Sequence, residues 1–153
     1  LWDGIGGLVA TDPTVKYLSG KVTIYSTSPE MSRKAMVYYL DMSFGDREGL
    51  ITSKNPETCT PEQIAFFKEL FTGADYKENY AILNNYVKSL GDSIPPFIHL
   101  YIGLSPTMKT FGTTFDPDFG DCYDTAMIIT TDDIYPDKYK RYVESYEKCK
   151  VRK

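Results

Sequence analysis

The pattern of apolar and polar positions predicts a chain in which helices and strands alternate. An apolar stripe at helical spacing runs through residues 1–10, and the alternation typical of a half-buried strand follows in residues 17–25. Gly20, inside that strand, predicts a β-bulge. A second amphipathic helix is predicted from Ser28, as its N-cap, to Gly45, which ends it.

The middle of the chain predicts a helical region after a loop. Residues 46–59 are polar and have no period, so we interpret them as an excursion. Thr60 and Gln63 then form a capping box, which predicts a helix up to Gly73. A further helix is predicted from about Lys77 to Leu90.

Two later segments are predicted to be helical as well. A double proline opens the apolar residues 97–104, which contain the one histidine of the chain. We interpret His99 as a packed core residue, because no Ser or Cys nucleophile context accompanies it. The last helix is predicted to begin at Pro136 and to repeat apolar positions as far as Cys149.

Between these helices, residues 109–131 predict a β-hairpin around the acidic turn 116–121. Gly120 in this turn permits the positive φ that such a turn needs. The uninterrupted apolar run 126–129 predicts a strand that is buried on both faces. Phe119 is expected to anchor the turn on the core.

The predicted element order is therefore α-β-α-(α-α-α)-β-β-α, a mixed α/β fold with enough helices to cover both faces of the sheet. The 153 residues fit a single domain.

No apolar run approaches the roughly 20 residues of a membrane span, and no signal peptide opens the chain. An odd number of cysteines without CxxC spacing argues against zinc or a disulfide framework, so a reducing cytoplasm is the simplest location. The cysteines are Cys59, Cys122 and Cys149.

Charge is distributed unevenly along the chain. The net charge is −4, yet residues 138–153 hold seven Lys or Arg side chains against two Glu. Two interpretations of this basic segment stay open: it docks on an anionic membrane or carrier protein, or it is a solvated helix end whose cations suit the helix dipole. Nucleic acid is not among the expected partners.

The acidic turn is the candidate site. Asp116, Asp118 and Asp121 lie within six residues, and Asp124 follows just beyond them. These carboxylates repel one another, which costs stability unless they face water, a cation or a cationic substrate. A solvated β-turn and a cation-binding site are therefore both consistent with the sequence.

Three stretches taken together carry a family resemblance. They are Leu1–Ile5 with Lys16–Ile24, Pro95–Pro96 leading to Tyr101, and Phe115–Asp124. In chain order they resemble the hemolysin-like branch of the GNAT superfamily of N-acetyltransferases, which includes enzymes that place a 3-hydroxyacyl chain on ornithine or glycine to make bacterial aminolipids. The similarity covers nearly the whole chain but only the second half of the family's domain. It implies a GNAT-like sheet covered by helices, truncated at its N-terminus, with a helical insertion over about residues 60–91.

The resemblance implies direct acyl transfer to an amine from an acyl carrier protein thioester or acyl-CoA. The amine loses its proton and attacks, and a tetrahedral oxyanion collapses as the thiolate departs. Asp116, Asp118 and Asp124 match the family's acidic motif and are implied to attract and deprotonate the amine. Tyr101 is a candidate hydroxyl for site packing or thiolate protonation. The donor is a substrate, and neither a tightly bound cofactor nor a metal is expected.

In this superfamily the donor pyrophosphate binds a loop just before the central helix. The central helix corresponds to residues 1–10 here. The loop is thus expected upstream of Leu1, and the chain is expected to begin inside a helix, to be inactive alone and to self-associate. The protein is expected in the cytoplasm, where it could also lie peripherally on the inner membrane. The alternative to an enzyme is a non-catalytic hemolysin-like module that keeps the fold and binds a membrane or a protein.

Overall fold

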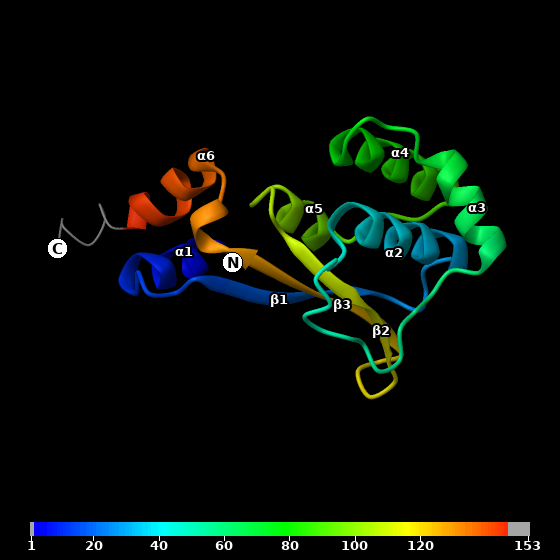
Figure 1. The fold of residues 1–153 in the computed structure, drawn as a ribbon, viewed down its shortest axis with the longest axis horizontal. Helices are drawn as coiled ribbons and strands as arrows, with labels where there is room; N and C mark the ends of the chain where they lie inside the picture. Colours follow the sequence, from blue (N-terminus) through cyan, green and yellow to red (C-terminus); the bar gives the residue numbers. More distant parts are fainter. Residues whose placement is uncertain (1, 147–153) are drawn as a thin grey trace.

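The structure, a computed structural model, describes residues 2–146, so the predictions made for Leu1, Cys149 and the rest of the basic segment after residue 146 lie outside it. The mixed α/β fold and the predicted element order are confirmed (Figure 1). The helices are α1 (Trp2–Thr11), α2 (Glu30–Phe44), α3 (Pro61–Leu70), α4 (Tyr76–Ser89), α5 (Pro96–Ile102) and α6 (Pro136–Tyr139). The other elements are β1 (Tyr17–Ile24), β2 (Lys109–Asp116), β3 (Cys122–Thr130), the 3₁₀ turn η1 (Thr131–Asp133) and the π-helical η2 (Lys140–Glu144).

The three strands form one antiparallel sheet in the order β1-β3-β2. β2 and β3 are the predicted hairpin, and Gly120 and Asp121 take positive φ angles of 72° and 50° in its turn. β1 joins the other side of β3 in a register that places Thr23 opposite Asp124. The central strand therefore contacts a segment about 100 residues earlier in the chain.

The hydrophobic core lies on one face of the sheet, where α2 and the helices α3 to α5 gather (Figure 1). Met127 and Ile129 point into it, whereas Ala126 is exposed together with Tyr17 and Lys21. The prediction that 126–129 is buried on both faces, and that helices cover both faces, is thus wrong. An antiparallel sheet commonly packs one face on the core and leaves the other accessible, and an apolar run alone does not distinguish the two cases.

α1 and the η2 segment pack against each other at the opposite end of the molecule from α3 and α4 (Figure 1). A β-carbon on Gly6 would lie 2.1 Å from the Tyr142 carbonyl oxygen, and one on Gly7 would lie 2.9 Å from the Tyr146 ring. Glycine at these two positions therefore allows the η2 segment to approach α1 closely. At Gly4 no atom comes within 4 Å.

The bulge predicted at Gly20 is found elsewhere. The β1–β3 register is continuous, and the irregularity lies in β2 between Thr110 and Thr113, where Gly112 has a φ of 79°. Gly20 instead allows a close approach of Tyr101 to the strand, since a β-carbon there would lie 2.1 Å from the Tyr101 hydroxyl oxygen. Both a bulge and a close approach explain a strand glycine, and only the neighbours decide between them.

The helix boundaries were predicted within a few residues. Thr60 and Gln63 form the predicted capping box at α3, although that helix ends at Leu70, before Gly73. α2 begins at Glu30 after Pro29 and has no side-chain cap, so the prediction of Ser28 as N-cap is wrong. The Ser28 carbonyl accepts a hydrogen bond from Arg33 Nη1 instead.

Within residues 2–146, none of the helices combines the length and apolarity that spanning a membrane requires. The same part of the chain holds no group of three or more His, Cys, Asp or Glu side chains placed to bind a metal ion. Cys59 and Cys122 are both free thiols.

Candidate functional site

Asp124 lies on the exposed face of β3, where its carboxylate holds two partners from β1. Lys21 Nζ lies 2.5 Å from one carboxylate oxygen, and the Thr23 hydroxyl donates to the other at 2.6 Å. Strand alternation places Lys21 and Thr23 on one face, and the register brings that face beside Asp124. The Asp124 side chain is 13% exposed and that of Lys21 is 50% exposed, so an internal ammonium covers a largely buried carboxylate.

The surroundings of that ammonium favour a positive charge. The hydrogen bond that Lys21 donates to Asp124 raises the pKa of Lys21, and the negative charge of Asp116 adds to this effect. Lys21 Nζ also lies 4.5 Å from the centroid of the Phe119 ring, within the range of a cation–π interaction. One carboxylate and an aromatic face thus contact a single cation, and a second carboxylate adds negative charge, which is the chemistry that recognises an amine.

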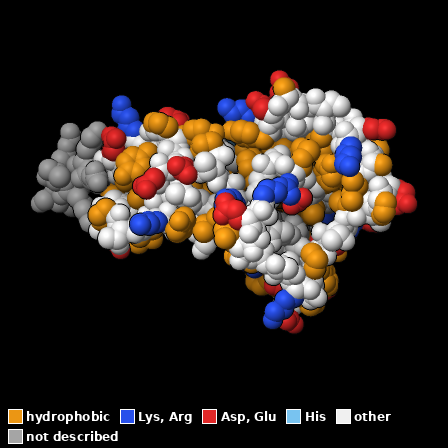
Figure 2. All heavy atoms as spheres, in the orientation of Figure 1, with side chains coloured by type: hydrophobic (Ala, Val, Ile, Leu, Met, Phe, Trp, Pro, Cys, Tyr) orange, Lys and Arg blue, Asp and Glu red, His pale blue; other side chains and the backbone are white. Residues whose placement is uncertain are grey.

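Phe119 does not anchor the turn on the core, as the sequence predicted, because it is 61% exposed. Its ring instead lies beside the Lys21 ammonium. In the lower part of the molecule in Figure 2, where this hairpin meets the loop 46–59, charged side chains of both signs stand beside hydrophobic ones.

Asp116 and Asp118 lie in the turn itself. Asp116 Oδ1 accepts a hydrogen bond of 3.1 Å from the Asp118 backbone N–H, which closes a local Asx-type turn. Asp116 is half-buried at the end of β2, and Asp118 is exposed. Asp116 therefore both shapes the turn and contributes negative charge near Lys21, whereas the structure gives Asp118 only its backbone contact.

Tyr101 is separated from the aspartates by the sheet. Its hydroxyl reaches Gly20, whose missing side chain would point to the same face as the buried Val22 and Ile24. Asp124 points to the opposite face with Lys21. Burial raises the pKa of the Tyr101 hydroxyl. The structure thus brings Asp116 and Asp124 together and places Tyr101 on the other side of β1.

His99 corrects a further prediction. It is exposed on α5, not packed in the core, and its ring lies 5.5 Å from that of Tyr80 on α4. The segment 97–104 is helical through Ile102, so its apolar residues are divided between two sides: Ile98 and Ile102 are buried while Phe97 and Leu100 are exposed. The apolar composition of the segment predicted that His99 is buried, but the helical period places His99 on the exposed side of α5.

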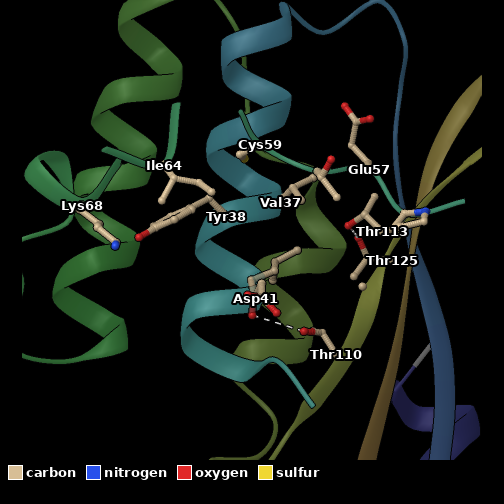
Figure 3. Close-up of a pocket in the computed structure, with 14 residues that line it drawn as sticks. Val37, Tyr38, Asp41, Glu57, Cys59, Ile64, Lys68, Thr110, Thr113 and Thr125 are labelled. Atoms are coloured by element: carbon tan, nitrogen blue, oxygen red, sulfur yellow. Dashed lines mark hydrogen bonds between the residues drawn. The ribbon is translucent and has the colours of Figure 1, made fainter. Parts of the chain in front are cut away.

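A cleft of about 370 Å³ opens on the helix-covered side of the sheet, between α2, α3, the edge strand β2 and residues 56–59 (Figure 3). Thr113 and Thr125 share a buried hydrogen bond of 2.7 Å beside it. Because Thr125 follows Asp124 directly, the cleft and the carboxylate lie on opposite faces of β3. The cleft is lined by Val37, Tyr38, Leu40, Asp41, Pro56, Glu57, Thr58, Cys59, Ile64, Lys68, Thr110, Gly112, Thr113 and Thr125.

A largely buried charge network holds the loop over this cleft. Glu57 lies 2.8 Å from Lys34 Nζ and 3.3 Å from Arg33 Nε, and Lys34 Nζ also donates to the Thr58 carbonyl at 2.5 Å. The Glu57 backbone N–H donates to the Thr113 carbonyl on the edge of β2 at 2.7 Å. The loop 46–59, which shows no period in sequence, is therefore fixed at its end by tertiary contacts.

Sequence reasoning missed the partners of Asp124. The alternation in residues 17–25 contains the signal that Lys21 and Thr23 share a face, but which strand they meet depends on the register. The cleft could not be predicted from the sequence, because its walls combine residues of α2, the loop 56–59, α3, β2 and β3.

Two curated proteins are similar to this chain. A glycine N(alpha)-acyltransferase of Phocaeicola vulgatus is 41% identical over 149 residues, which cover 97% of this chain and 45% of that protein. A glycine N(alpha)-acyltransferase of Bacteroides thetaiotaomicron is 40% identical over 149 residues, covering 95% of this chain and 43% of the relative. The chain thus spans less than half the length of these relatives. No protein-family model and no solved structure matches it.

Proposed function

We propose that this chain is part of an N-acyltransferase that moves an acyl group from a thioester to the amine of a small amino acid. The observation that carries the proposal is the 40–41% identity to two glycine N(alpha)-acyltransferases along nearly the entire chain. We further propose that the fold is the later part of a GNAT-like domain, that the donor is an acyl carrier protein thioester or acyl-CoA, and that the product belongs to aminolipid synthesis. The order β1-β3-β2 with a helical insertion before the hairpin supports the fold proposal.

In the proposed reaction Asp124 receives the substrate ammonium. The incoming ammonium exchanges with Lys21, whose half-exposed side chain can turn into water. Asp124 takes a proton from the ammonium, directly or through water, and the neutral amine attacks the thioester carbonyl. The carbon–nitrogen bond forms, the carbon–sulfur bond breaks, and the departing thiolate takes up a proton.

The neighbouring residues support this role in different ways. Thr23 fixes the orientation of the carboxylate, Phe119 offers a π face to the cation, and Asp116 adds negative charge. Asp118 stays in the proposal as a turn residue with an exposed carboxylate. Tyr101 supports β1 from the other face, so its proposed role is to position the strand that carries Lys21 and Thr23.

The test compares N-acyl amino acids in cells that lack the gene with those in cells that regain it, measured by mass spectrometry. Restoration by the wild-type gene and failure by Asp124→Asn is the expected result. The control is Asp132→Asn, the same change at an exposed aspartate of η1. An unchanged pool of N-acyl amino acids after gene loss overturns the proposed function and favours the non-catalytic module.

Kinetics on the complete natural enzyme separate the residue roles. Loss of a charged hydrogen bond in Asp124→Asn corresponds to about 1.5–3 kcal/mol, or roughly 10- to 150-fold in kcat/KM for the amine. Lys21→Met is expected to lower KM for the amine, because the internal competitor is removed. If Lys21→Met raises KM instead, Lys21 is part of the amine site and the proposed exchange is wrong.

A further inference from the structure

We propose that the cleft between α2, α3 and β2 binds the hydrocarbon chain of an anionic amphiphile that bears a carboxylate. Assigning that amphiphile to the product of acyl transfer rests on the proposed function, whereas the binding itself does not. The shared chemistry fits two sources, a free fatty acid and an N-acyl amino acid, and the experiment below distinguishes them.

The walls of the cleft are suited to a hydrocarbon. Val37 and Leu40 from α2, Ile64 from α3 and Pro56 from the loop present apolar surface around about 370 Å³. This volume lies within the range of roughly 300–1,000 Å³ that is typical of small-molecule sites. Removing apolar ligand surface from water is the favourable term that such walls supply.

Four polar side chains along the floor of the cleft already have partners inside the protein. Thr113 and Thr125 bond each other, the Thr110 hydroxyl donates to the Leu40 carbonyl at 3.3 Å, and the Cys59 thiol faces the Lys34 carbonyl at 3.7 Å. A polar ligand body would therefore have to compete with these bonds. A chain of methylene groups has no such requirement, so the floor accepts it without leaving a hydroxyl unpaired.

The charges at the rim select the head group. Asp41 is paired with Arg47 at 3.6 Å, and Glu57 is held by Lys34 and Arg33. Among the residues that the structure describes, Lys68 is the charged lining residue without an ion-pair partner. Figure 3 shows the Tyr38 side chain extending toward Lys68, so an ammonium and a phenol hydroxyl stand at the same end of the cleft. Both can donate to a carboxylate.

Calorimetry with the purified protein tests the ligand class. Decanoate and N-decanoylglycine are expected to bind, decanol to bind several-fold more weakly, and decyltrimethylammonium to bind least. Within the fatty-acid series, each methylene that enters the cleft is expected to raise affinity about fourfold. Tighter binding of decanoate than of N-decanoylglycine indicates a free fatty acid, and the reverse order indicates the N-acyl amino acid. Equal binding of the anionic and cationic amphiphiles overturns the proposal.

Cys59 locates the ligand without any variant. It is half-buried in the cleft, and burial raises the pKa of its thiol, so alkylation is followed at mildly alkaline pH. Saturating decanoate or N-decanoylglycine is expected to slow alkylation of the Cys59 peptide at least fivefold in mass spectrometry. Amphiphile binding with unchanged Cys59 labelling places the chain elsewhere and overturns the assignment.

Two variants complete the test. Ile64→Trp fills the cleft and is expected to abolish binding, whereas Ile51→Trp, the same change at a 56% exposed loop residue, is expected to leave it unchanged. Lys68→Met is expected to remove the preference for decanoate over decanol while decanol still binds. If amphiphile binding fails but gene loss still depletes N-acyl amino acids, the cleft assignment is wrong and the proposed function stands. If amphiphiles bind but gene loss leaves the N-acyl amino acids unchanged, the proposed function is wrong and the cleft assignment stands.

Discussion

The hydroxyl oxygen of Tyr101 occupies the space that a side chain on Gly20 would need, because a β-carbon there would lie 2.1 Å from it. Gly20→Ala is therefore expected to lower the free energy of unfolding by about 1–3 kcal/mol through overpacking. Urea denaturation measures the change. In a Tyr101→Phe background, which lacks the clashing oxygen, the cost of Gly20→Ala is expected to shrink, so that the two changes are coupled.

Gly4→Ala is the matched control for that prediction. No atom lies within 4 Å of a β-carbon at Gly4, which is inside α1. Alanine there is expected to stabilise by roughly 0.5–1 kcal/mol, because it loses less backbone entropy on folding. Equal effects at Gly4 and Gly20 would show that the approach of Tyr101 does not constrain β1.

Glu57→Gln is expected to destabilise the fold by roughly 1–3 kcal/mol, because it leaves the largely buried Lys34 and Arg33 without a compensating charge. Thermal unfolding measures the loss. Glu48→Gln is the control: its carboxylate is 63% exposed and pairs with Lys109 at 2.5 Å, so about 0–1 kcal/mol is expected. The network has no stabilising role if the two variants melt alike.

Phe119→Ala is expected to change stability by no more than about 1 kcal/mol, the size of an exposed cation–π contact with Lys21. Phe67→Ala, at a fully buried ring of the core, is expected to cost about 3–5 kcal/mol. Chemical denaturation of both variants gives the comparison. A loss at Phe119 as large as that at Phe67 would mean that the turn does pack on the core.

Alkaline pH is expected to weaken the contact between α4 and the segment before α6. Burial, together with the hydrogen bond to Tyr135, raises the pKa of Tyr76 from 10.0 to about 12. The folded state keeps this proton longer than the unfolded chain does, so the contribution is complete below pH 10 and is lost as pH rises toward 12. Stability measured across this window should fall less steeply in Tyr76→Phe than in wild type; an identical slope would exclude Tyr76 as the responsible group.

Self-association is expected along β1. In the described residues β1 pairs only with β3, so its outer edge is open. Tyr17 at its start is 60% exposed, and Tyr25, directly after its end, is 65% exposed. Light scattering is expected to show a mass that rises with protein concentration. Lysine at both tyrosines should suppress the rise, whereas Tyr139→Lys on α6 should not. A clean monomer at high concentration would contradict the prediction.

Local chemistry was enough to predict the elements. The capping box at Thr60 and the Gly120 turn depend on contacts within a few residues, so the sequence alone determined where α3 begins and where the hairpin reverses. The period of apolar positions likewise predicted the order of helices and strands. Ends without a strong cap were less certain, as the start of α2 shows.

The candidate site, by contrast, was decided by the tertiary structure. The acidic residues could be read from the sequence, but whether Asp124 faces water or a cation depends on a register that joins it to Lys21 and Thr23 across about 100 residues. A shift of one residue would have turned Lys21 to the core face. The exposure of Phe119 and the cleft beside Lys68 arise in the same way, from surfaces brought together only by packing, on which a local pattern carries no information.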